Sequence, residues 1–150
     1  MKHSTSDIDS VALCHKHGIS LTTKRQNVFD LLVSESNPLS AYDIVEAYKD
    51  RYESAIPAMS VYRILDFLTE SGLTHKLESV NKYMVCEHIA CDHTHRNAQF
   101  LICDSCNATE EVILSKTAHQ LLVDDISTTG FKLNQLQFEL HGVCKNCQNT

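Results

Sequence analysis

Two short cysteine pairs constrain this chain more than any other feature. Cys103 and Cys106 form the first pair, Cys144 and Cys147 the second, and two residues separate the members of each pair. This spacing lets both sulfur atoms of a pair face one point across a tight turn. Two such turns brought together would supply four thiolates in a tetrahedron, the arrangement that structural Zn²⁺ prefers. Four cysteine ligands leave no open position, so the predicted site is structural.

A redox-active pair or two disulfides would also fit these cysteines. Residues 1–7 lack the apolar region of a secretory signal, and the longest apolar runs are too short to cross a bilayer. We therefore expect a cytoplasmic protein without membrane contact. Seven cysteines in such a reducing compartment are better explained by metal binding than by disulfides.

The sequence around the cysteine pairs predicts a small α/β domain over residues 97–150. Strands are predicted at 99–102, 110–114 and 131–140, with a helix that Ser115 caps between the second and third strands. Such a short segment buries little apolar surface by itself. We expect it to need its zinc and a partner subunit to complete a core.

Helical patterns fill the first half of the chain. Thr23 and Gln26 have the spacing of a capping box, and Ser40 with Asp43 starts a further helix. A last helix follows Pro57 and carries an apolar stripe of Val61, Ile64, Leu65 and Leu68. Two β-prone segments at 73–78 and 83–86 then predict a hairpin. Helices followed by a hairpin indicate a winged helix-turn-helix, in which the last helix enters the major groove.

The polar side of this last helix is the candidate DNA-binding face. Ser60, Tyr62 and Arg63 lie off the apolar stripe, and Arg63 could reach a guanine edge or a phosphate. The alternative is that Tyr62 belongs to the core and Arg63 is an ordinary surface charge. The net charge of −6 counts against a broadly basic nucleic-acid binder, although phosphate contacts need only a local positive face.

A polar segment at 87–96 is interpreted as a hinge between a domain at 1–86 and the domain at 97–150. Further residues of metal-ligating type lie within this segment and on either side of it. These residues are His75, Cys86, His93, His95 and Glu111. One thiolate, imidazoles and a carboxylate would form a mixed site that holds Zn²⁺ more exchangeably than four thiolates. Filling it would fix the relative orientation of the domains, as in a sensor. The alternative is a set of surface histidines and a buried cysteine.

Several segments resemble the ferric uptake regulator family. They are residues 57–68 (Pro-Ala-Met-Ser-Val-Tyr-Arg-Ile-Leu-Asp-Phe-Leu), residues 21–25 (Leu-Thr-Thr-Lys-Arg) and the two cysteine pairs. The resemblance extends over roughly residues 8–148. Within the family, residues 40–43, 75–79 and 83–86 resemble the zinc uptake regulator branch.

The resemblance implies an α+β chain with an N-terminal winged helix-turn-helix domain and a small C-terminal α/β dimerisation domain. It implies a zinc-responsive repressor of zinc uptake and homeostasis genes, which binds a palindromic double-stranded DNA operator as a homodimer. Each subunit would hold one structural and one regulatory Zn²⁺.

The resemblance also assigns residues to these roles. The regulatory zinc ligands would be His75, Cys86, Glu111 and a hinge histidine. For the last of these, His95 has the expected spacing before Phe100, and His93 is its rival. Arg63 would contact a base, and the other expected DNA-binding residues are Tyr42, Ser60, Tyr62, Lys24 and Arg25.

Two other functions are open at this point. A regulator of the same family could sense iron, manganese or peroxide, but Cys86 argues against this because oxygen and imidazole ligands suit those metals better than a thiolate. A zinc hydrolase or deaminase would need an open zinc and a catalytic carboxylate. The sequence lacks His-Glu-x-x-His, Gly-x-Ser-x-Gly and the deaminase pattern, and we expect no enzyme.

Overall fold

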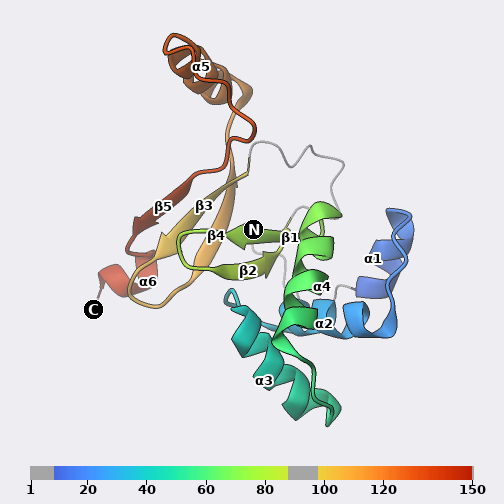
Figure 1. Cartoon of the computed structure of the whole chain (residues 1–150). Coiled ribbons are helices and arrows are strands. Elements are labelled where there is room, and N and C mark those ends of the chain that lie inside the picture. Colours follow the sequence, from blue (N-terminus) through green and yellow to red (C-terminus); the bar gives the residue numbers. More distant parts are fainter. Residues whose placement is uncertain (1–8, 88–97, 150) are drawn as a thin grey trace. The chain divides into compact units, whose positions relative to one another are not determined.

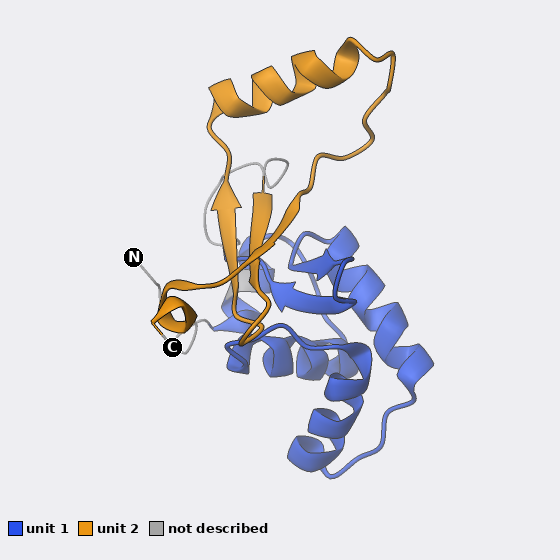
Figure 2. Ribbon diagram, turned by 90° about the vertical axis from the view of Figure 1, so that its left-hand side faces the viewer, with its two compact units in different colours: residues 1–92 blue, residues 93–150 orange. Residues whose placement is uncertain are grey.

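The structure is a computed structural model that describes residues 9–87 and 98–149. The chain divides into two compact units, Met1–Asp92 (unit 1) and His93–Thr150 (unit 2), which Figure 2 colours separately. Apart from Glu87, the predicted hinge over 87–96 lies outside the described residues, as do its histidines His93 and His95.

Unit 1 is a winged helix-turn-helix (Figure 1), as the sequence predicted. A two-stranded antiparallel hairpin follows four helices. The elements in order are α1 (Ser10–Lys16), α2 (Thr23–Ser34), α3 (Ala41–Tyr52), α4 (Ala58–Glu70), β1 (Thr74–Leu77) and β2 (Lys82–Val85).

Local sequence explains where these helices begin and end. Thr22 caps α2 by accepting a hydrogen bond from the Arg25 amide, so the cap lies one residue before the predicted Thr23. At α3, Ser40 and Asp43 exchange side-chain and backbone hydrogen bonds in a full capping box. Helix α4 follows Pro57 and buries the predicted apolar stripe. Just beyond it, Gly72 has a φ of 75°, a left-handed conformation that favours glycine.

The hairpin is bonded directly to the helical core of unit 1. Leu39, in the loop before α3, exchanges two backbone hydrogen bonds with Tyr83 of β2, at 2.9 and 2.8 Å. The amide of Leu73 donates to the carbonyl of Leu68, which joins β1 to the end of α4. Because Tyr83, Leu73 and Leu68 are all buried, the hairpin shares the core that fixes α4.

Over residues 98–149, unit 2 is a three-stranded sheet with two helices. Its elements are β3 (Ala98–Cys103), β4 (Thr109–Ile113), α5 (Lys116–Ser127), β5 (Glu139–Gly142) and α6 (Lys145–Gln148). The strand order is β4-β3-β5, with β3 antiparallel to β4 and parallel to β5. The short helix α6 was not predicted.

The last predicted strand, at 131–140, was wrong in its extent, because regular pairing covers only Glu139–Gly142. The buried side chain of Gln99 explains the difference. Its amide nitrogen donates to the Leu136 carbonyl, and its oxygen accepts from the Phe138 amide. The Gln99 side chain thus bonds this part of the backbone, where strand pairing was expected. The alternation of apolar residues at 136, 138 and 140 does not reveal these side-chain bonds.

Helix α5 stands off the end of the sheet in both views of the molecule (Figures 1 and 2). None of its residues, all of which the structure describes, is buried. Leu121 on this helix is 60% exposed. Within residues 9–87 and 98–149, no helix is long and apolar enough to cross a membrane.

Candidate metal centres and DNA-binding face

The four predicted structural cysteines come together in unit 2. Their sulfur atoms all lie within 4.8 Å of one another, and the sulfurs of Cys106 and Cys144 are 3.8 Å apart. Two thiolates bound to one Zn²⁺ at the usual ~2.3 Å in a tetrahedron stand about 3.8 Å apart. The donor set and its spacing therefore fit a tetrahedral zinc ion.

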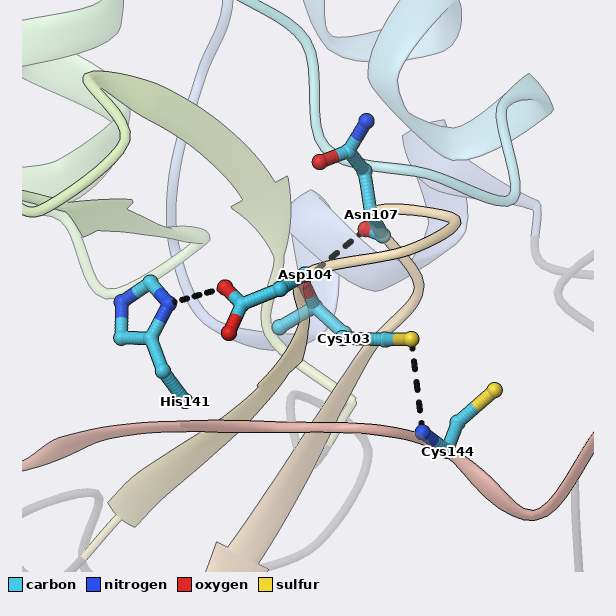
Figure 3. A network of polar contacts seen from close by, with 6 residues as sticks. Cys103, Asp104, Asn107, His141 and Cys144 are labelled. Carbon is cyan, nitrogen blue, oxygen red and sulfur yellow. Dashed lines mark hydrogen bonds and ion pairs between the residues drawn. The ribbon is translucent and has the colours of Figure 1, made fainter. Parts of the chain in front are cut away.

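Two backbone turns set up this arrangement. Strand β3 ends at Cys103, and the chain reverses through Asn107, whose left-handed conformation (φ 61°) lets its amide donate to the Cys103 carbonyl at 2.9 Å. The second turn leads into α6, where the Cys147 amide donates to the Cys144 carbonyl. The amide of Cys144 faces the sulfur of Cys103 at 3.3 Å, as Figure 3 shows.

The thiols of Cys103 and Cys147 differ in how readily they lose their protons. Hydrogen bonds from backbone amides, chiefly that of Cys144, lower the pKa of Cys103 to about 6. Hydrogen bonds among the thiols, chiefly with Cys144, raise the pKa of Cys147 to about 12. The Cys103 thiol therefore loses its proton readily, whereas the Cys147 thiol keeps its proton unless a positive charge compensates the thiolate. A divalent cation supplies that charge and displaces the remaining protons.

A polar pair supports the two turns from the side. The carboxylate of Asp104 lies 2.7 Å from the His141 ring nitrogen, and Figure 3 shows the two side chains pointing at one another. The amide of Asp104 also donates to the Gly142 carbonyl at 2.9 Å. These contacts join the ends of β3 and β5, each next to a cysteine pair. Sequence reasoning missed this pair because nothing local links residues so far apart in the chain.

Two of the predicted regulatory ligands lie close together in the hairpin of unit 1. His75 is on β1 and Cys86 directly follows β2, where its amide donates to the Leu73 carbonyl at 3.0 Å. A ring nitrogen of His75 and the Cys86 sulfur lie within 4.8 Å of each other. The Cys86 side chain is buried, with 2% of its surface exposed. The hairpin therefore provides one imidazole and one thiolate that can share an ion.

Glu111, the third predicted ligand, lies on β4 of unit 2, opposite Phe100 of β3. It is only 6% exposed. Carboxylates are seldom buried unless they are paired, hydrogen-bonded or bound to metal. His95 and its rival His93 lie outside the described residues.

The predicted DNA-binding residues are distributed over three helices of unit 1. On α4, Arg63 is exposed, whereas Ser60 and Tyr62 are half-buried, and Tyr62 packs partly against the core. Tyr42, in the first turn of α3, is 67% exposed. Arg63 and Tyr42 are thus available to a ligand without rearrangement.

Lys24 and Arg25 at the start of α2 differ from each other. Lys24 is exposed. The guanidinium of Arg25 lies 3.7 Å from the centre of the Phe67 ring on α4, a cation–π contact. Arg25 therefore helps to hold α2 against α4, and its expected contact with DNA stays a prediction.

Known proteins resemble the chain over most of its length. The model of the ferric uptake regulator family matches residues 16–141. The zinc uptake regulation protein of Escherichia coli (strain K12) is 36% identical over 140 residues, which cover 90% of this chain and 77% of that protein. A solved zinc uptake regulator complexed with zinc and DNA has a TM-score of 0.82 at 29% identity, covering 99% of this chain and 97% of that one. The holo XcZur structure gives 0.78 at 31% identity, with coverages of 97% and 99%.

Proposed function

Since the chain belongs to the ferric uptake regulator family and, within it, to the zinc uptake regulators, we propose that it is a zinc-responsive, DNA-binding transcriptional repressor of zinc uptake and homeostasis genes. One observation carries this proposal. The unit that presents Arg63 on an exposed face of α4 also holds His75 and Cys86 close enough to share a metal ion. Unit 1 would then both contact DNA and provide two ligands of the regulatory metal. The protein acts in the cytoplasm as a regulator rather than an enzyme.

Each subunit holds two zinc ions in this proposal. Cys103, Cys106, Cys144 and Cys147 provide all four ligands of the structural ion, so no open position is left for a substrate. The regulatory ligands are His75, Cys86, Glu111 and His95, with His93 as the rival for the last position. In both sites Zn²⁺ supplies positive charge and directional bonds to groups distant in sequence.

The regulatory ligands come from the domain at 1–86, the hinge at 87–96 and the domain at 97–150. Binding one ion with all of them restricts how the two domains can be oriented. The remaining orientations would set the spacing between the α4 helices of the two subunits. If that spacing fits a palindromic operator, zinc increases the affinity for DNA. Coupling of this kind typically amounts to ~1–3 kcal/mol, or roughly 5–150-fold in affinity.

A homodimer formed through unit 2 explains the apolar surface of that unit. Its exposed large hydrophobic residues are Leu101, Val112, Ile113, Leu121, Phe131, Phe138, Leu140 and Val143. Helix α5, described in full, buries no residue in the single chain. A second copy that covers α5 and these residues would give this unit the core that one chain lacks.

Zinc and DNA binding together test the proposed function. Operator duplexes are first selected from a random-sequence library with zinc-loaded protein. Protein depleted of its exchangeable metal is then titrated with Zn²⁺, Fe²⁺ or Mn²⁺ while its affinity for these duplexes is measured. Zn²⁺ should restore binding at the lowest free concentration. A stronger response to Fe²⁺ or Mn²⁺ would favour a regulator of another metal, and no metal response would contradict the proposal.

Replacing Leu121 with aspartate should convert the dimer to a monomer. The change places a charge without a partner in the predicted interface, which costs several kcal/mol. Sedimentation would measure the mass at concentrations where the wild type is dimeric. Thr117→Asp, at an exposed polar position of the same helix, should stay dimeric. If Leu121→Asp does too, α5 lies outside the interface.

Replacing Arg63 with alanine should weaken operator binding while the zinc content and the dimer stay unchanged. Loss of a base contact is expected to cost ~1–3 kcal/mol per half-site and to relax the preference at one base pair. Binding to a set of single-base operator variants would measure both effects. An equal loss on every sequence would show instead that Arg63 contacts phosphate.

A further inference from the structure

We propose that Met59 contacts the methyl group of a thymine close to the base pair that Arg63 recognises, and that it is a specificity-determining residue for the operator. This inference rests on the proposed function, since it requires α4 to enter the major groove. It adds an apolar contact to a set of expected DNA contacts that is otherwise polar or aromatic.

The first observation is the exposure of Met59. Of the large apolar side chains on α4, a helix that the structure describes in full, Met59 is exposed over 65% of its surface, whereas Val61, Ile64, Leu65 and Leu68 are buried. Exposing a large apolar side chain forgoes the stabilisation that its burial would give. Met59 therefore contributes little to the fold of unit 1 and is available for another contact.

The second observation is the position of Met59 on the helix. Met59 lies four residues before Arg63, so the two side chains lie one above the other on the same face. The face continues with the exposed residues Asp66 and Glu70. Met59 is thus the apolar residue at the N-terminal end of the exposed stripe. The N-terminal residues of a recognition helix are those that contact base edges.

The chemistry of the groove indicates what Met59 would contact. The major-groove edges of the four bases carry donors and acceptors, and the one apolar group there is the C5 methyl of thymine. A thioether side chain is flexible and polarisable, so it can adapt to such a methyl group. One helical turn advances ~5.4 Å, while successive bases of a strand are ~3.4 Å apart. The thymine should lie about one or two base pairs from the guanine recognised by Arg63.

Deoxyuridine substitution isolates this contact because it removes the thymine methyl and leaves the pairing unchanged. In the duplexes selected with zinc-loaded protein, each thymine of both half-sites is replaced in turn by deoxyuridine. The wild type should lose affinity at one position by about fourfold per half-site, the equivalent of ~0.8 kcal/mol for one buried methyl group. Met59→Ala should bind the thymine and deoxyuridine duplexes equally at that position, and Met59→Leu should still prefer thymine.

Arg63→Ala is the matched control on the same face. It should lose its preference at the guanine position but keep the thymine preference. The inference is overturned if the wild type tolerates deoxyuridine everywhere, if Met59→Ala still discriminates, or if selection returns no thymine within two base pairs of the position set by Arg63. In each of these cases zinc-dependent DNA binding by the wild type persists and leaves the proposed function standing. Loss of zinc-dependent binding in the wild type itself would overturn both.

Discussion

Replacing Cys103 or Cys147 with serine should remove the structural zinc and leave unit 2 unfolded or monomeric. Structural zinc sites contribute on the order of 10 kcal/mol to small domains. Unit 2 cannot replace that amount by packing, because no residue of α5, a helix described in full, is buried in the single chain. Zinc content by elemental analysis, helix content by circular dichroism and mass by sedimentation would measure the three consequences together.

Ser105→Ala is a suitable control for these variants. Ser105 lies in the same turn between two ligands and is exposed, so its loss should change neither the zinc content nor the dimer. A Cys103→Ser or Cys147→Ser protein that stays folded and dimeric without the ion would refute the structural role.

Replacing Cys86 with serine should leave one zinc per subunit and shift the zinc response of DNA binding to much higher concentrations. A serine hydroxyl does not ionise near neutral pH, so the site would keep two imidazoles and a carboxylate but lose its thiolate. Disturbing only the partners of metal ligands typically costs 10–100-fold in metal affinity, and the loss of a ligand should cost at least that. A zinc titration of operator binding would measure the shift, alongside the zinc content of each protein.

Three comparison variants make the Cys86 result specific. Cys14→Ser also replaces a buried cysteine of unit 1 and should respond to zinc like the wild type. His95→Ala should behave like Cys86→Ser, whereas His93→Ala should stay near the wild type. If the two histidine variants are reversed, His93 is the ligand. If Cys86→Ser responds like the wild type, the sensory site lies elsewhere.

Local patterns were sufficient to predict much of this fold. The capping box at Ser40 and the apolar stripe from Val61 to Leu68 depend on residues three or four positions apart, so the helices of unit 1 could be inferred directly. The same holds for the cysteine pairs, because the two-residue spacing is itself the geometric requirement for a shared ion. That the two pairs lie close together was predicted from the four thiolate ligands that a structural Zn²⁺ requires, and not from any periodicity of the sequence.

Contacts between residues distant in sequence could not be predicted in this way. The Gln99 side chain bonds the Leu136 carbonyl and the Phe138 amide, in a segment that alternates like a strand. Asp104 meets His141 only because β3 and β5 are parallel neighbours. Met59 belongs to residues 57–68, which resemble the ferric uptake regulator family. Only its exposure in the structure distinguishes it from the apolar residues that form the core.

The hydrogen bonds between Leu39 and Tyr83 have a mechanical consequence. They fasten the hairpin that carries His75 and Cys86 to the loop before α3, and Leu73 fastens its other strand to α4. Bending of the hairpin away from the helices would break these backbone bonds, each of which is costly to leave unmade. Through these bonds, a displacement of the hairpin would be passed on to α4, the helix proposed to contact DNA.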